Sequence, residues 1–284
     1  MRVLDLFSGI GGFSLGLERA GMTTVAFCEI EEYPRKVLAK HWPGVPIYED
    51  VRDVSKQRLD ADGITGIDVI TGGFPCQDLS NAGRKAGIDG ERSGLWSECA
   101  RLLGEIRPKY AIFENVTALL SGDNGKWFER VLWDISQVGY DAEWHCISAS
   151  DIGAHHHRDR VWIVVYPNET FAEGGSLSGR IRKEIANTYG RSGSRDSIQV
   201  LADTLLRGQQ GQGKYVEPVN PKKETIGEAA KPVDGCIGQI WEAEPGMGRV
   251  VDGVWKPAYG HRLASLGNAV VPQIPELIGR AIMS

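Results

Sequence analysis

The chain has 284 residues, of which 42% are hydrophobic, and its net charge of −5 at pH 7 excludes a uniformly basic coat protein, although a local basic face could bind nucleic acid. Its five cysteines are widely spaced and form no C-x-x-C pair, which argues against a disulfide framework and a zinc site and indicates a reducing compartment. The sequence shows no signal-peptide pattern and no apolar run of membrane-spanning length, so we expect a cytoplasmic protein that does not enter a membrane.

The first elements predict a glycine turn between a strand and a helix. An apolar run over residues 1–7 ends at Ser8-Gly9-Ile10-Gly11-Gly12, and the apolar residues that follow have helical spacing up to Gly21. Such a turn lets a ligand approach the backbone and the helix N-terminus. A second β-prone run, residues 24–28, is followed by Glu29, where nucleoside-binding α/β folds hold ribose hydroxyls. The alternatives are that the glycines merely make the turn and that Glu29 is a solvated loop residue. The order of a glycine turn followed by an acid about 20 residues later favours a nucleoside site.

Two later strands are predicted to carry reactive side chains to one edge of the sheet. The run 67–70 precedes Gly73-Phe74-Pro75-Cys76-Gln77, and the run 109–113 precedes Glu114. Because the carboxyl ends of parallel strands share an edge, we expect Cys76 and Glu114 to lie on the same edge. A lone cysteine is more often a small buried apolar residue, but the glycines before Cys76 and the polar residues after it favour a nucleophile.

The remaining periodic segments complete an α/β pattern. We expect helices at 33–41, 95–106, 127–138 and 274–283, a short strand at 47–51, and a strand pair at 142–148 and 161–166.

Two loops invite a functional interpretation. The Gly-rich segment 80–94 carries Arg84, Lys85 and Arg92, and is either a surface loop or a lid that brings positive charge to a substrate. Three adjacent histidines at 155–157 suggest a metal at first sight, but adjacent side chains splay apart and no acidic or cysteine partner stands at ligand spacing, so we predict no metal.

The composition shifts after Pro167 toward Gly, Ser, Gln and Arg. Residues 167–223 carry a charge of +3, against −8 for the rest of the chain. This segment is either a separate polyanion-binding surface or a decorative insertion.

A nucleophilic cysteine and an acid beside a nucleoside-type site suit methylation at C5 of a pyrimidine. Addition of a thiolate from Cys76 at C6 would make C5 nucleophilic. Glu114 could protonate or hold N3, and Arg160 could stabilise charge at O2. The methyl donor would need an adenosine part, which would account for the glycine turn and Glu29.

In their order, these segments resemble the DNA (cytosine-5)-methyltransferase family, in particular its phage or prophage members and those of restriction-modification systems. The matching segments are Asp5–Phe13, Gly73–Gln77, Glu114–Val116, Arg158-x-Arg160 and Gly267–Val271. In addition, Glu29 matches the acid that binds the ribose, and Asp50 matches the residue that contacts the adenine amino group.

The resemblance implies a doubly wound, mostly parallel, Rossmann-like sheet. Residues 1–166 and 258–284 would form the catalytic, cofactor-binding domain, and the loop-rich segment 167–257 would be the target recognition domain. The implied partner is double-stranded DNA, from which one cytosine is flipped out. A monomer and a cognate restriction endonuclease are further expectations.

The resemblance also implies the site residues. Cys76, Glu114, Arg158 and Arg160 would be catalytic, and Ser80, Arg84, Lys85 and Arg92 would contact DNA. The cofactor would be S-adenosyl-L-methionine, leaving as S-adenosyl-L-homocysteine, and its expected contacts are Phe7, Gly9, Ile10, Gly11, Gly12, Glu29, Ile30, Asp50, Val51, Pro75, Leu95, Asn268 and Ala269.

This chain departs from the family pattern at His156, where glutamine is usual, and at Ile30, where an aromatic residue often stands. Two alternatives remain open. Relatives that act on transfer RNA usually have proline at the position of Phe74, and a catalytically inactive relative would merely bind DNA. Retention of Cys76, Glu114 and Asn268 argues against the inactive form.

Overall fold

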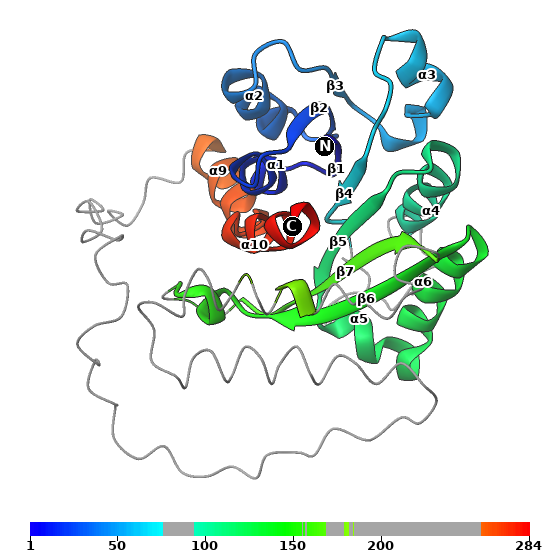
Figure 1. Ribbon diagram of the computed structural model, residues 1–284. Coiled ribbons are helices and arrows are strands. Elements are labelled where there is room, and N and C mark those ends of the chain that lie inside the picture. The colour runs from blue at the N-terminus through cyan, green and yellow to red at the C-terminus, as the bar shows by residue number, and fades with distance from the viewer. Residues whose placement is uncertain (76–93, 155, 157, 169–178, 182–183, 185–256) are drawn as a thin grey trace, which may run out of the picture.

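The structure, a computed structural model, describes residues 1–75, 94–154, 156, 158–168, 179–181, 184 and 257–284 (Figure 1). Within these ranges seven strands form one sheet in the order β3-β2-β1-β4-β5-β7-β6. The first five in that order run parallel, β7 runs antiparallel to β5, and β6, which pairs antiparallel with β7, has the same direction as the first five. The strands are β1 (Arg2–Leu6), β2 (Thr23–Cys28), β3 (Ile47–Tyr48), β4 (Val69–Gly72), β5 (Tyr110–Val116), β6 (Tyr140–Ile147) and β7 (Arg160–Pro167).

Helices cover both faces of the sheet (Figure 1). One face carries α1 (Gly12–Arg19), α2 (Glu32–His41), α9 (Pro257–Asn268) and α10 (Gln273–Met283). The other carries α3 (Lys56–Ala61), α4 (Leu95–Ile106), α5 (Ala118–Ser121) and α6 (Lys126–Gln137). The predicted doubly wound, mostly parallel fold is therefore confirmed.

The two faces of the sheet follow from alternation along the strands. In β7, Val161 and Ile163 pack into the apolar cluster shared with α4 and α6, whereas Trp162 and Val164 pack into the cluster shared with α1 and α10. The central strands are buried on both sides, as is typical of a parallel sheet covered by helices. At the end of each strand, every second side chain therefore points to the face of the sheet that α1 and α10 cover.

Most elements predicted from the sequence are present. The helix at 95–106 has the expected bounds, and the strand pair and the closing helix are confirmed within a few residues. The strand predicted over 47–51 is shorter, because Asp50 caps a 3-10 turn, η1 (Val51–Asp53), by accepting a hydrogen bond from Arg52 N. The fourth strand runs on into the glycine pair and includes Gly72.

Within the described ranges, the sequence reasoning missed the helices α3, α5 and α9. The first two are short, although Ser55 at the start of α3 caps Arg58 N and is the residue type that signals a helix start. Gly260 and Gly267 interrupt the helical pattern of α9. That helix lies against α2, where the Arg262 Nε donates to the Tyr33 hydroxyl at 3.3 Å.

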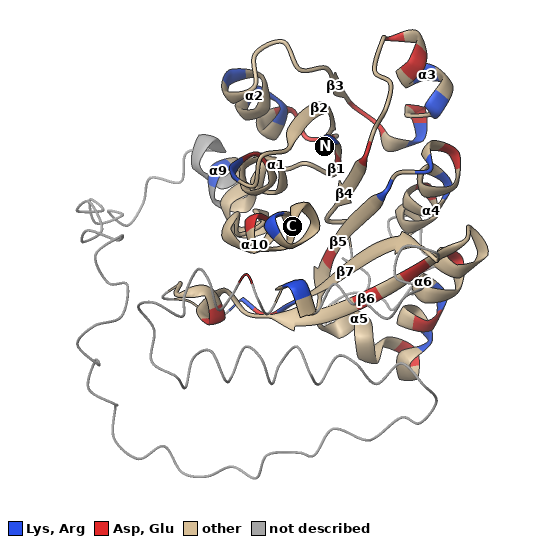
Figure 2. Ribbon diagram, in the orientation of Figure 1, with Lys and Arg blue, Asp and Glu red and all other residues tan. Residues whose placement is uncertain are grey.

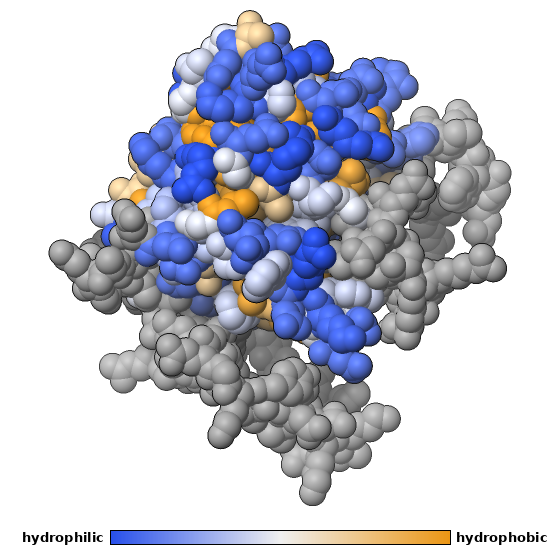
Figure 3. Space-filling model, turned by 90° about the vertical axis from the view of Figure 1, so that its right-hand side faces the viewer, coloured by the Kyte–Doolittle hydropathy of each residue, from blue (hydrophilic) through white to orange (hydrophobic). Residues whose placement is uncertain are grey.

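The described surface is mainly polar. Lysine and arginine alternate with aspartate and glutamate over α3, α4 and α6 (Figure 2). The face of the molecule with these helices is largely hydrophilic, with small apolar patches between the polar side chains (Figure 3). Among the helices in the described ranges, none has the length and apolar character needed to cross a bilayer.

Candidate active site

The glycine turn after β1 is held by the acid after β2. The Glu29 carboxylate accepts hydrogen bonds from Gly9 N at 2.7 Å and from Glu31 N at 2.8 Å, using one oxygen for each. Phe7 and Gly9 both have positive φ, and a Cβ placed on Gly9 would meet no atom within 4 Å. The turn is thus open at Gly9, and the carboxylate keeps further acceptor lone pairs for a ligand.

The next glycines are needed for close packing. A Cβ on Gly11, which has φ +88°, would lie 2.5 Å from the ring of Trp42, and one on Gly12 would lie 2.4 Å from the carbonyl oxygen of Val270. Trp42 is in turn held by a hydrogen bond from its Nε1 to Glu18. The turn therefore packs against the end of α2 at Trp42 and against the C-terminal segment at Val270. Sequence reasoning missed Trp42, because its contact with Gly11 spans many residues.

Asp5 joins the glycine turn to the strand that leads toward Cys76. Its side chain is fully buried and accepts hydrogen bonds from the hydroxyls of Ser14 in α1 and Thr71 in β4, each at 2.7 Å. Burial raises the pKa of Asp5 to about 7, against the lowering effect of these two hydrogen bonds. The ends of β1 and β4 are thus joined through one carboxyl group.

The residues expected around an adenine lie after β2 and β3. Ile30 is 63% exposed beside the Glu29 turn, and Val51 is buried. The Asp50 carboxylate contacts both the backbone and the side chain of Arg52, and the hydrogen bond from that side chain is the main cause that lowers the pKa of Asp50. Leu95 is half-buried at the start of α4. An apolar side chain and an ionised carboxylate are therefore available on this side.

The ends of β4 and β5 meet as the sequence predicts. Gly72 pairs with Phe113, and a Cβ on Gly73 would lie 3.4 Å from Glu114 Oε2. Asn115, which is buried, donates from Nδ2 to the carbonyl oxygen of Phe74 at 3.1 Å. This bond fixes the backbone two residues before Cys76. Its position directly after Glu114 was the available signal for Asn115, but sequence reasoning gave it no role.

Glu114 faces Arg160 across two antiparallel strands. Arg160 Nε lies 3.0 Å from Glu114 Oε1, and the glutamate residue is 8% exposed. Burial raises the pKa of Glu114, and the charges of Arg160 and Arg158 oppose that rise. A buried carboxyl of raised pKa beside a guanidinium is suited to hold or transfer a proton.

Arg158 lies in a different environment from Arg160. Its Nη1 donates to the carbonyl oxygen of Gly267 at 2.6 Å, near the end of α9. Burial and the neighbouring charge of Arg160 lower the pKa of Arg158. Asn268, which follows Gly267, is the last residue of α9 and is exposed. Ala269 comes next and is half-buried. His156 is exposed. The structure thus connects the paired arginines both to Glu114 and to the C-terminal segment.

Several predicted residues lie outside the described residues. These are Cys76, the expected DNA contacts Ser80, Arg84, Lys85 and Arg92, and nearly all of the segment 167–257. Pro75 is the last described residue before Cys76. Among the described residues, no three His, Cys, Asp or Glu side chains are grouped in a way that could hold a metal ion.

A doubly wound sheet with a glycine turn after β1 and an acid after β2 defines a Rossmann-like α/β protein of a nucleoside-binding type. Comparison with known proteins identifies the family, because the model of the C-5 cytosine-specific DNA methylase family matches residues 1–231. The chain belongs to the C-5 cytosine-specific DNA methylase family.

Individual relatives agree with this assignment. The chain is 38% identical over 168 residues to the type II methyltransferase M2.BsuMI of Bacillus subtilis, a match that covers 58% of this chain and 41% of the relative. It is 32% identical over 228 residues to M.DsaV of Dactylococcopsis salina, covering 75% and 60%. A structure described as a prophage-encoded DNA modification methyltransferase of E. coli superposes with a TM-score of 0.52 and 29% identity, covering 59% of this chain and 47% of that one. The chain spans less than two thirds of the length of these relatives.

Proposed function

We propose that the protein transfers a methyl group from S-adenosyl-L-methionine to C5 of a cytosine in double-stranded DNA. The observation that carries the proposal is the buried Glu114–Arg160 pair beside Gly73, at the sheet edge next to the glycine turn. An acid from β5 and a cation from β7, beside the end of the strand that leads to Cys76, match the needs of addition to a pyrimidine ring. The family assignment points to the same chemistry.

The residues at the carboxyl ends of β1, β2 and β3 fit an adenosine-bearing cofactor. Gly9 leaves room for close approach, since a Cβ there would meet nothing within 4 Å. Glu29 would accept from the ribose hydroxyls, Ile30 would pack on the adenine, and Asp50 would accept from its amino group. The other expected contacts are Phe7, Ile10, Gly11, Gly12, Val51, Pro75, Leu95, Asn268 and Ala269. S-adenosyl-L-methionine supplies an electrophilic methyl group when bound.

The proposed chemistry at the cytosine divides between three side chains. The Cys76 thiolate adds to C6, forming a carbon–sulfur bond and making C5 nucleophilic. Glu114 holds a proton at N3, a role favoured by its raised pKa. Arg160, already paired with Glu114, stabilises negative charge at O2. C5 then takes the methyl group as S-adenosyl-L-homocysteine leaves, and loss of the C5 proton to water expels the thiolate and restores the aromatic ring.

The finer features of the proposal concern DNA recognition. Cytosine has to leave the base stack before C6 can be attacked, so we propose base flipping. Residues 167–257 are proposed as the target recognition domain and residues 80–94 as the segment that closes over the base. We further propose a monomer that acts in the cytoplasm, with a cognate restriction endonuclease as a candidate partner, as for a restriction-modification system.

The decisive test uses a duplex that contains 5-fluorocytosine, because C5 then has no proton to lose and the enzyme remains attached. We expect the wild-type protein, given S-adenosyl-L-methionine, to form a covalent adduct with the duplex. Cys76→Ala should form none and should still bind S-adenosyl-L-homocysteine. Cys146→Ala, which removes a half-buried thiol of β6, is the matched control and should form the adduct normally.

Other outcomes identify the alternatives. Methyl transfer to transfer RNA and not to duplex DNA would favour the hypothesis of an enzyme that acts on transfer RNA. DNA binding without methyl transfer to either substrate would favour an inactive binding protein. A covalent adduct formed by Cys76→Ala would refute the proposed nucleophile. Bisulfite sequencing of DNA from an expressing host would then give the modified base and its sequence context together.

A further inference from the structure

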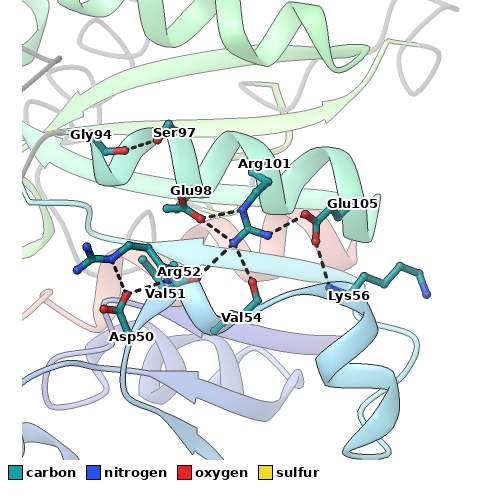
Figure 4. A network of polar contacts seen from close by, with 10 residues as sticks. All are labelled: Asp50, Val51, Arg52, Val54, Lys56, Gly94, Ser97, Glu98, Arg101 and Glu105. Atoms are coloured by element: carbon teal, nitrogen blue, oxygen red, sulfur yellow. Dashed lines mark hydrogen bonds and ion pairs between the residues drawn. The ribbon is translucent and has the colours of Figure 1, made fainter. Parts of the chain in front are cut away.

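One arginine of α4 has an unusually large set of partners. The Arg101 guanidinium contacts Glu98 at 2.7 Å and Glu105 at 2.8 Å, both on the same helix (Figure 4). Its side chain is 32% exposed. The two carboxylates hold the guanidinium plane in place and leave its remaining N–H groups aimed away from α4.

The other partners of Arg101 are backbone carbonyls of the segment after β3. Nη2 donates to Val54 O at 2.8 Å and to Val51 O at 3.3 Å. These carbonyls lie at the two ends of the 3-10 turn η1, which begins directly after Asp50. Figure 4 shows the turn lying against α4 along this row of contacts. Arg101 therefore fixes the backbone that carries Asp50 and Val51.

Glu105 extends the same connection by one more turn of α4. Its Oε1 contacts Arg101, while its Oε2 accepts a hydrogen bond from Lys56 N at 3.2 Å. Lys56 is the first residue of α3, so this bond satisfies a backbone donor that has no partner within its own helix. The whole segment from Asp50 to Lys56 is thus held against α4 through two side chains.

We infer that Arg101 is a positioning residue for the adenine side of the cofactor site, acting through the backbone at Val51 and Val54. The inference rests on the proposed function, in which Asp50 and Val51 contact the adenine. A guanidinium presents a planar fork of five N–H donors and can bind two carboxylates and two carbonyls together. Because α4 also follows the Cys76 segment in the chain, Arg101 ties the adenine side to the helix that leads from the nucleophile.

The inference is tested first without any cofactor, by amide hydrogen exchange in the free protein. In Arg101→Gln we expect faster exchange at Asp53 and Val54, whose amides close the 3-10 turn. Arg130→Gln is the matched control, since Arg130, whose side chain is 55% exposed, forms an i,i+4 pair with Asp134 on α6. Exchange at Asp53 and Val54 should be unchanged in that control. Equal exchange in both variants would overturn the inference.

The second measurement separates positioning from general stability. We expect the KM for S-adenosyl-L-methionine and the Kd for S-adenosyl-L-homocysteine to rise about tenfold in Arg101→Gln, with kcat within about twofold. Arg101→Lys keeps a cation beside Glu98 and Glu105. Any fall in Tm that Arg101→Gln shows should therefore be largely reversed in Arg101→Lys. Its KM should stay raised, because one ammonium cannot serve both carbonyls as well.

The possible failures can be distinguished. Recovery of both Tm and KM in Arg101→Lys would show that charge alone matters and would overturn the positioning role. If the wild-type protein bound no S-adenosyl-L-homocysteine, the proposed function would fail. Even then, faster exchange at Asp53 and Val54 in Arg101→Gln would establish that Arg101 holds the 3-10 turn. Unchanged exchange would refute the claim that Arg101 holds this turn.

Discussion

The carboxylate of Glu114 and the guanidinium of Arg160 form an ion pair, with 3.0 Å between Oε1 and Nε. They come from β5 and β7, which are antiparallel neighbours, and Val116 pairs with Arg160 in the register of these strands. Both side chains are largely buried, at 11% and 22% exposure. Each charge therefore depends on the other for compensation, and removal of one should cost more than removal of both.

A double-mutant cycle tests this dependence. Arg160→Met should leave the Glu114 carboxyl buried beside an apolar side chain and destabilise the protein by about 3 kcal/mol. Arg160→Met combined with Glu114→Gln should recover most of that loss, because no buried charge is left unpaired. Urea denaturation of the wild type, Arg160→Met, Glu114→Gln and the double variant gives the coupling free energy. Simple additivity of the two substitutions would contradict the pairing, and methyl transfer should be lost in all three variants.

Local patterns were enough to predict the elements that position this site. The glycine turn, the helix at 95–106 and the strand ends before Cys76 and Glu114 are set by nearby glycines and by apolar spacing, which can be counted along the chain. Their placement on one sheet edge then follows from the rule for parallel strands.

The supporting contacts could not be predicted, because they join residues far apart in sequence. Asn115 fixes the carbonyl of Phe74, and Arg101 holds Val51 and Val54, through side chains that look like ordinary polar positions in the sequence. The short strand predicted over 47–51 was wrong in its second half for a local reason. Asp50 prefers to cap a turn with its own side chain rather than extend a strand.

The packing of the C-terminal helix on α1 gives a second prediction. A Cβ on Gly16 would lie 2.2 Å from the carbonyl oxygen of Pro272 and 2.9 Å from Glu276 N, and neither backbone atom can move without α10. Gly16→Ala should therefore destabilise the protein by about 2–3 kcal/mol, measured by urea denaturation. Gly267→Ala is the control, since a Cβ there meets nothing within 4 Å. Equal stabilities of the two variants would mean that α1 and α10 are not in contact.

The buried carboxyl of Asp5 predicts a pH dependence of stability. Its pKa is raised from 3.8 to about 7, chiefly by burial, so between these values the folded state binds a proton that the unfolded state has released. Stability from this group is therefore greatest below about pH 4 and falls as the pH rises to about 7. Asp5→Asn mimics the protonated form at every pH, because its amide can donate to one hydroxyl and accept from the other.

The wild-type protein should thus lose up to about 4 kcal/mol relative to Asp5→Asn between pH 4 and pH 7, and the difference should level off above that range. Urea denaturation across this range measures it. Thr71→Val removes a hydrogen bond that favours the ionised carboxyl, so in that variant the decline should continue to higher pH. Parallel stability curves for wild type and Asp5→Asn would show that Asp5 is ionised in the folded protein, and that its two hydroxyl partners are sufficient to hold a charge in the core.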